Sequence, residues 1–222
     1  MMIRTAATSK SFWVRSNRLL SSCKIVEVGP RDGLQNESTI VSTDTKVSLI
    51  HLLTGAGCST LEVGAFVSPQ WVPQMADSEQ VLEKLVPQEG VSYSCLVPNV
   101  KGMLLAASHA DKCTEVAIFA SASESFSQNN INCSIQESME RFRPVMELAL
   151  EKSIPVRGYV SCVVGCPYEG KVQLDNVVQV SEQLLEMGCF EISLGDTIGV
   201  GTPHQVKAML QAVQVSAVGC DF

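Results

Sequence analysis

The sequence predicts an α/β fold, namely a TIM-type (β/α)8 barrel that is incomplete and has about six of its eight βα units. Short apolar segments alternate with longer amphipathic segments from residue 24 onward, as in parallel strands joined by helices. Polar residues capable of chemistry follow or interrupt almost every predicted strand, which is typical of the mouth of a barrel. The competing architecture, an open doubly wound sheet, would concentrate such residues at one switch point.

The first three units are predicted from apolar patterning. Each predicted strand is a short apolar run, and each predicted helix has apolar residues at helical spacing. Gly55 and Gly57 mark the end of the first helix, and Asp77 gives the second an acidic start. In chain order the elements are strand 24–28, helix 44–56, strand 60–63, helix 77–85, strand 92–97 and helix 100–107.

The last three units carry clearer boundary signals. Ser134 and Glu137 have the spacing of a capping box, Gly188 is expected to end a helix, and Pro203 fits the first turn of one. The elements are strand 115–119, helix 134–152, strand 156–162, helix 174–187, strand 191–194 and helix 202–214. A complete barrel typically has about 250 residues, so we expect this chain to stop where a seventh unit should begin, with a divergent tail at 216–222.

Residues 1–23 differ from the barrel region at 24–215. They include four basic residues and no acidic one, a composition typical of a mitochondrial transit peptide. The alternative is a disordered basic tail. We expect the transit peptide to be removed on import and the mature chain to act in the mitochondrial matrix.

Composition disfavours several other classes of protein. The formal net charge of −7 argues against nucleic-acid binding, which needs a basic surface. No apolar run is long enough to cross a membrane. The nine cysteines include no C-x-x-C pair, so we expect reduced core thiols rather than a zinc site.

Arg31 and Asp32 follow the first predicted strand in a glycine-flanked turn. Asp32 offers the hard oxygen ligand that Mg²⁺ or Mn²⁺ prefers. Arg31 is a fixed cation suited to a carboxylate or to a developing enolate oxygen. The alternative is a solvated Asp-Gly turn beside a surface arginine.

Two further carboxylates are candidates for the same site. Glu62 interrupts the second predicted strand, where a buried carboxylate is costly unless it is paired. Arg31 is its expected partner, and the alternative is an outward, solvated Glu62. Asp196 ends the sixth predicted strand and could act as a general base or hold a metal-bound water. Its alternative role is that of a turn or cap residue.

Seven strings between residues 24 and 213 have an unusual residue order. They are KIVEVGPRDGLQNE (24–37), FVSP (66–69), WVPQM (71–75), NINCS (130–134), RGYVSC (157–162), GCPYEG (165–170) and EISLGDTIGVGTP (191–203). In these strings the chain closely resembles the hydroxymethylglutaryl-CoA lyase family. The pair Gly64-Ala65 departs from the hydroxyl residues that animal members often carry.

The resemblance implies a TIM barrel with one divalent cation, Mg²⁺ or Mn²⁺. It also implies cleavage of the acyl-CoA substrate 3-hydroxy-3-methylglutaryl-CoA to acetyl-CoA and acetoacetate, in ketone-body formation and leucine breakdown. Arg31 would bind the substrate and neutralise the enolate, and Asp32 would be a metal ligand. Glu62 would orient Arg31, and Asp196 would be an acid–base residue. The full-length form would be a possible homodimer.

Part of the family's site has no counterpart in this sequence. The resemblance implies a His-x-His metal-ligand pair at the seventh strand, and an Asn ligand and a catalytic Cys after the eighth. Cys166 lies after the fifth predicted strand and is not assigned to catalysis. We therefore expect the chain to be inactive by itself. The alternative is a non-catalytic truncated isoform that binds a partner or the full-length enzyme. A related barrel that condenses acetyl-CoA with 2-oxo acids is disfavoured by the long shared strings.

Overall fold

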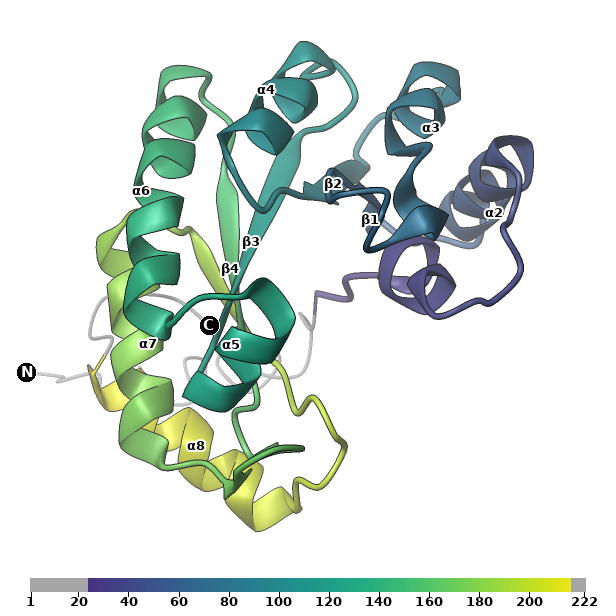
Figure 1. Ribbon diagram of the computed structural model, residues 1–222. Helices are drawn as coiled ribbons and strands as arrows, with labels where there is room; N and C mark the ends of the chain where they lie inside the picture. The colour runs from purple at the N-terminus through teal and green to yellow at the C-terminus, as the bar shows by residue number, and fades with distance from the viewer. Residues whose placement is uncertain (1–23, 217–222) are drawn as a thin grey trace, which may run out of the picture.

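The computed structural model describes residues 24–216 (Figure 1). Five parallel strands form one sheet in the order β1-β2-β3-β4-β7. Their bounds are β1 Thr60–Ala65, β2 Ser92–Leu96, β3 Glu115–Ser121, β4 Val156–Ser161 and β7 Glu191–Leu194. A two-stranded hairpin pairs β5 Gly165–Cys166 with β6 Gly170–Lys171. The predicted transit peptide, and the predicted tail beyond residue 216, lie outside the described residues.

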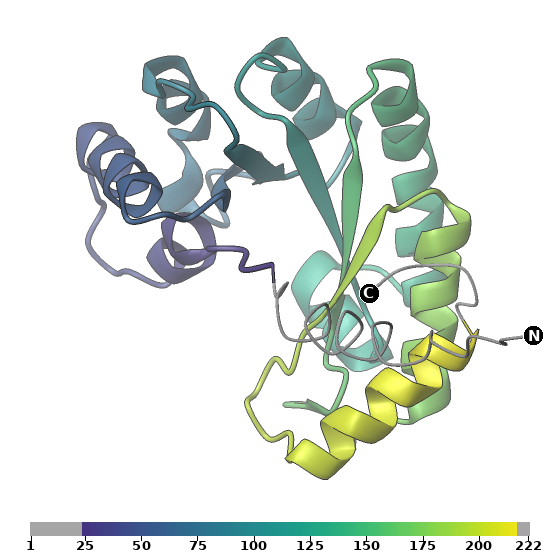
Figure 2. The same cartoon turned by 180° about the vertical axis from the view of Figure 1, so that it is seen from behind.

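Helices alternate with the strands of the sheet. They are α2 Thr43–Gly55, α3 Ser78–Lys84, α4 Val100–Ser108, α5 Glu124–Ile131, α6 Ile135–Glu151, α7 Leu174–Glu186 and α8 Pro203–Ser216, with the short turns η1 Gly29–Gly33 and η2 Pro73–Met75. The two opposite views show α4 and α6 along the outside of the curved sheet (Figures 1 and 2). The sheet does not close within residues 24–216. The prediction of an incomplete barrel is confirmed.

The predicted first strand at 24–28 is wrong as a full strand. Within this segment only Glu27 pairs with β1. Its amide donates to the carbonyl of Thr60 at 2.9 Å, and its carbonyl accepts from the amide of Glu62 at 2.8 Å. The chain then enters η1, where Pro30 has a fixed backbone angle and no amide hydrogen. The ladder therefore cannot continue, and a single bridge occupies the position of the first barrel strand.

Helix α5 was not predicted from the sequence patterns, which place only polar residues after the fourth strand. The amide of Phe126 donates to the hydroxyl of Ser123 at 3.1 Å, so Ser123 caps the helix. Asn129 donates to the carbonyl of Ser125 at 2.7 Å, one turn earlier. These polar side chains therefore cap the helix and bond within it.

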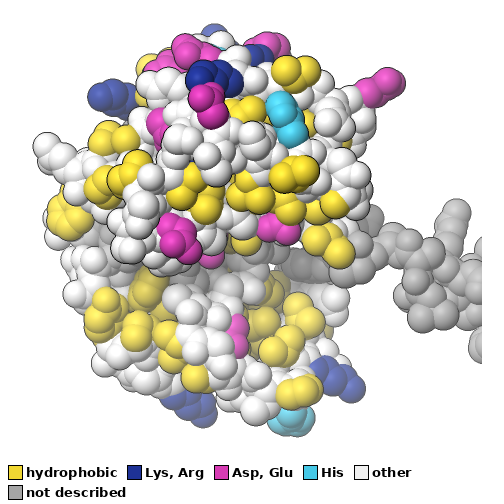
Figure 3. Space-filling model, turned by 90° about the vertical axis from the view of Figure 1, so that its right-hand side faces the viewer, with side chains coloured by type: hydrophobic (Ala, Val, Ile, Leu, Met, Phe, Trp, Pro, Cys, Tyr) yellow, Lys and Arg dark blue, Asp and Glu magenta, His cyan; other side chains and the backbone are white. Residues whose placement is uncertain are grey.

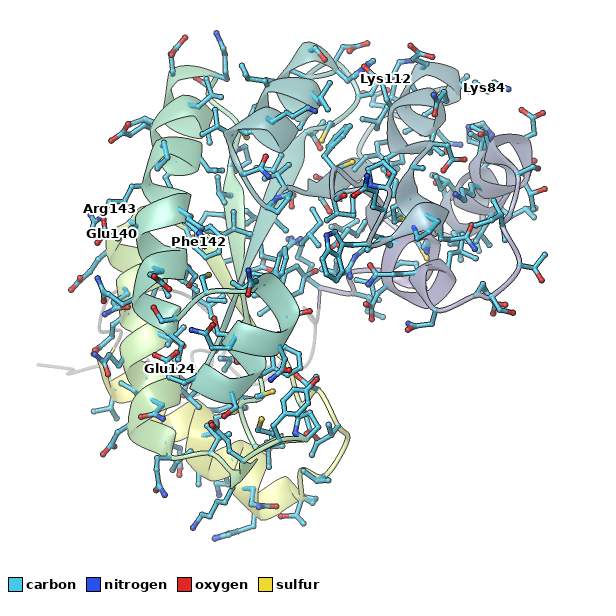
Figure 4. All side chains as sticks on the ribbon, viewed as in Figure 1. Lys84, Lys112, Glu124, Glu140, Phe142 and Arg143 are labelled. Carbon is cyan, nitrogen blue, oxygen red and sulfur yellow. The ribbon has the colours of Figure 1, made fainter. Side chains whose placement is uncertain are left out.

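Helix α6 shows how sequence patterning positions the outer layer. The predicted capping box is present, with the amide of Ser134 donating to Glu137 at 2.7 Å and the amide of Glu137 to Ser134 at 3.1 Å. Phe142 points toward the strands and is 3% exposed, whereas Glu140 and Arg143 point outward (Figure 4). The apolar stripe of the helix therefore packs on the sheet.

A charged layer fills the amino-terminal end of the strands. Arg157 of β4 is 1% exposed and lies 2.6 Å from Glu191 and 2.9 Å from Glu115. Lys24 adds a second cation 3.0 Å from Glu191. Because Glu115 and Glu191 begin β3 and β7, Arg157 ties three neighbouring strands together.

The inner face of the sheet carries a second, smaller apolar cluster. Its buried members are Ala65, Met75, Leu96 and Ala117, and Phe119 and Tyr159 pack against them. Figure 3 shows a hollow on this side of the molecule, with hydrophobic side chains on both sides of it. None of the helices within the described range is long and apolar enough to span a bilayer.

Candidate functional site

Arg31 and Glu62 form a buried ion pair. Arg31 lies in η1, Glu62 lies within β1, and Nε of Arg31 donates to Oε1 of Glu62. Glu62 has no exposed surface, and the side chain of Arg31 is 11% exposed. A carboxylate in such a position is costly unless it is paired. The ion pair expected from the sequence is therefore present, and it fixes the direction of the guanidinium.

The η1 turn carries Arg31 to this position. The three successive amides of residues 31–33 donate to the carbonyl of Val28 at 3.1, 2.7 and 3.3 Å. The amide of Gly29 donates to Oε1 of Glu27 at 2.6 Å, and a Cβ on Gly29 would lie 2.7 Å from that oxygen. A larger residue at position 29 would therefore displace the Glu27 carboxylate and break its contact with the amide of residue 29.

Tyr159 joins this pair from β4. Its hydroxyl donates to Oε2 of Glu62 at 2.5 Å, and Cζ of Arg31 lies 5.9 Å from the centre of its ring. Burial and the neighbouring Glu62 carboxylate raise the pKa of Tyr159 above its ordinary value. The phenol therefore stays protonated at neutral pH and remains a donor to Glu62.

The sequence reasoning did not single out Tyr159, although a signal was available. Alternate residues of a strand share one face, so Arg157, Tyr159 and Ser161 lie on the same side of β4. Two polar residues on one face of an otherwise apolar strand indicate the inner face of the barrel. A tyrosine between them is therefore placed where Glu62 and Arg31 are expected.

The guanidinium of Arg31 keeps its positive charge in this environment. Burial favours the neutral form, but the Glu62 and Asp32 carboxylates outweigh it and raise the pKa of Arg31. Nη1 of Arg31 lies 2.9 Å from Oδ1 of Asp32. The two carboxylates engage two of the five N–H donors of the guanidinium. The others can serve an anionic oxygen of a ligand.

Asp32 lies at the solvent edge of the network, with its side chain 57% exposed. A hard divalent cation needs several oxygen ligands to replace its hydration shell. Within the part of the chain that the structure describes, no group of three or more His, Cys, Asp or Glu side chains could hold a metal ion. Asp32 can be one ligand, but these residues do not make a complete site.

Asp196 follows β7 and shapes the turn after it. Its carboxylate accepts from the amides of Val200 at 3.2 Å and of Gly201 at 2.7 Å. No hydrogen bond or ion pair within residues 24–216 joins it to Arg31 or Glu62. The geometry supports the turn role, and the acid–base role of Asp196 stays a prediction.

Comparisons with known proteins agree with the fold and with the resemblance. The solved HMG-CoA lyase of Brucella melitensis superposes with a TM-score of 0.85 at 52% identity, covering 88% of this chain and 68% of that one. A Gallus gallus protein named mitochondrial hydroxymethylglutaryl-CoA lyase is 55% identical over 190 residues, which are 86% of this chain and 63% of that protein.

A Rattus norvegicus protein named cytoplasmic 3-hydroxy-3-methylglutaryl-CoA lyase is 56% identical over 190 residues, 86% of this chain and 55% of its own length. The chain thus spans 55% and 63% of the lengths of these two curated relatives. A sequence profile described as HMGL-like matches residues 22–218. Because that profile covers most of the sequence, the chain belongs to the HMGL-like family.

Proposed function

We propose that this chain supplies the Arg31 part of a carbon–carbon lyase site, which cleaves 3-hydroxy-3-methylglutaryl-CoA to acetyl-CoA and acetoacetate. The observation that carries the proposal is the buried network in which Glu62 accepts from both Arg31 and Tyr159. The relatives named as hydroxymethylglutaryl-CoA lyases support the choice of substrate.

The reaction requires a stabilised enolate. A base takes the proton of the tertiary hydroxyl group, the carbon–oxygen bond becomes a ketone, and the electrons of the broken carbon–carbon bond form the enolate of acetyl-CoA. A cation held in place before the reaction stabilises that oxygen without reorganising during it. Arg31 is held in that way by Glu62, which is fixed in turn by Tyr159. Asp196 is our candidate for the acid–base residue.

The divalent cation is part of the proposal only through Asp32. Mg²⁺ or Mn²⁺ would polarise oxygen atoms of the substrate, and Asp32 would be one of its ligands. The residues at 24–216 provide no complete cation site. The remaining ligands would have to come from outside these residues.

The compartment and the assembly are also proposals. We place the chain in the mitochondrial matrix because its first 23 residues are basic and lack acidic residues. Relatives of nearly equal identity are named mitochondrial and cytoplasmic, so identity alone does not choose between the compartments. A homodimer is proposed for the full-length form.

A chimera tests the proposed function directly. The matched 190-residue region of the Gallus gallus relative is replaced by the matching residues of this chain, and release of acetoacetate from 3-hydroxy-3-methylglutaryl-CoA is measured with Mg²⁺. We expect turnover by the chimera and a large loss of it on Arg31→Gln. Arg143→Gln, on the outer face of α6, is the matched control. A chimera with native circular dichroism and no acetoacetate release contradicts the proposal.

A further inference from the structure

Two thiols, Cys162 and Cys166, stand four residues apart where the chain leaves β4, and Cys166 is among the groups that raise the pKa of Cys162. Cys162 directly follows the strand, and Cys166 is the second residue of β5. Their exposed fractions are 0% and 2%. The ion-pair network of Arg31 and Glu62 includes neither thiol, so the proposed function leaves this cluster unexplained.

The sulfur of Cys166 is surrounded by hydrogen-bond donors. The hydroxyl of Ser123 lies 3.0 Å from it and the amide of Tyr168 lies 3.4 Å from it. Burial opposes ionisation, but the Ser123 hydroxyl and the amides of Glu169 and Tyr168 outweigh it and lower the pKa of Cys166. Donors around a sulfur favour the thiolate, which is the nucleophilic form of cysteine.

Cys162 is the protonated neighbour. Burial raises its pKa to about 11, the hydroxyl of Thr197 opposes the rise, and the adjacent Cys166 thiol adds to it. Its backbone has φ of 62°, in the left-handed region that non-glycine residues rarely occupy. Such a conformation is found where the surrounding structure demands it, and often at functional sites. The amide of Cys162 donates to the hydroxyl of Thr197 at 2.8 Å, which anchors this bend.

We propose that Cys162 and Cys166 form an oxidisable dithiol that takes a hydroperoxide, with Cys166 as the attacking sulfur and Cys162 as the resolving one. The thiolate of Cys166 attacks one peroxide oxygen, the O–O bond breaks, and hydroxide leaves, so that Cys166 becomes a sulfenic acid. The sulfur of Cys162 attacks the sulfur of Cys166 and the S–O bond breaks. The hydroxide that leaves Cys166 takes the proton of Cys162 and departs as water. In total, two thiols and one hydrogen peroxide give one disulfide and two waters.

The disulfide would lie against the loop of Asp196. The amide of Val163 donates to the carbonyl of Gly195 at 3.2 Å, next to the Cys162–Thr197 contact. Oxidation at this position would therefore be adjacent to a candidate acid–base residue. The proposal does not depend on the lyase reaction, because the thiols and their donors are all present in this chain.

The test is a peptide map of the purified 222-residue chain before and after hydrogen peroxide. Trypsin releases residues 158–171, whose only cysteines are Cys162 and Cys166. After oxidation we expect iodoacetamide no longer to label this peptide. The peptide should also be lighter than its reduced, unlabelled form by two hydrogen atoms, and dithiothreitol should restore both the labelling and the mass. The peptide with Cys189, a buried thiol whose pKa burial raises to about 12, is the internal control and should keep its label.

Variants separate the two sulfurs. Cys162→Ser should accumulate a sulfenic acid on Cys166 that dimedone traps, and Cys166→Ser should leave Cys162 reduced. Ser123→Ala removes a donor to the Cys166 sulfur and should slow oxidation. If a cysteine variant fails to fold, the peptide maps of Ser123→Ala and of the wild-type chain still test the proposal. Unchanged labelling of peptide 158–171, or a disulfide formed only between chains, would overturn the proposal.

Discussion

The hydroxyl of Tyr159 lies 2.5 Å from Oε2 of Glu62, while Oε1 of the same carboxylate accepts from Arg31. These residues are 97 and 31 positions from Glu62 in the chain. One fully buried carboxylate therefore joins η1, β1 and β4 at the inner face of the sheet. The orientation of the Arg31 cation depends on both contacts.

Replacing Tyr159 by Phe should destabilise the fold. The change leaves Oε2 of the buried Glu62 without its donor, and an unsatisfied buried acceptor costs about 1–3 kcal/mol. Urea unfolding of residues 24–222 would measure the loss. Tyr168→Phe is the matched control, because Tyr168 is 58% exposed. Equal midpoints for the two variants would contradict the importance of the contact.

Replacing Arg31 by Gln in the chimera should lower kcat by about 10²–10³, the range for the loss of one oxyanion-type donor. The change removes the proposed enolate cation and also leaves Glu62 without its charged partner. Glu62→Gln should retain more activity, since Arg31 keeps its charge and loses only its orientation. Steady-state acetoacetate release measures both, and a full-rate Arg31→Gln chimera would refute the assignment.

Replacing Asp32 by Asn should weaken the binding of the divalent metal but leave the stability of the fold almost unchanged. Asp32 is more than half exposed, so its contact with Arg31 contributes little to stability. Removing one negative ligand charge weakens binding of a hard cation. Titration of the chimera with Mn²⁺ should show a higher half-saturating concentration. An unchanged titration, with an unchanged rate, would rule out Asp32 as a ligand.

The 222-residue chain alone should not release acetoacetate. Asp32 is a single carboxylate, and no cluster of three or more potential ligands occurs at residues 24–216. The assay uses residues 24–222 with Mg²⁺ or Mn²⁺, and we expect weak metal binding and poor solubility. Turnover that a chelator and Asp32→Asn both abolish would show that the prediction is wrong.

Stability should fall in acid partly through Glu191. Burial opposes its ionisation, but Arg157 and Lys24 outweigh it and lower the pKa of Glu191 below its ordinary value of 4.5. A depressed folded-state pKa gives stability that is complete above the unfolded value and is lost as the pH falls through the folded value. Urea unfolding at pH 7 and below pH 4.5 should show this loss, and Glu191→Gln should flatten it. If the Glu191→Gln variant loses stability as steeply in acid, Glu191 is not a source of the pH dependence.

Local sequence patterns were sufficient for the outer framework. The capping box of Ser134 and Glu137, the stop at Gly188 and the start at Pro203 are local signals, and the structure has a helix boundary at each. Patterning failed at residues 24–28 and at α5. In the first case η1 interrupts the ladder, and in the second a cap at Ser123 makes a helix from polar residues.

The sequence by itself determined the family and the βα alternation. It also predicted Arg31 as the partner of Glu62, because a carboxylate within an apolar strand needs a cation if it is buried. Only the tertiary structure decided that Tyr159 completes the pair, that Asp196 binds the amides of its own turn, and that Ser123 donates to Cys166. Those contacts depend on how the strands curve and how the loops fold back at their ends. Such geometry arises from the packing of segments that are distant in the sequence, and the apolar pattern of one segment carries no information about it.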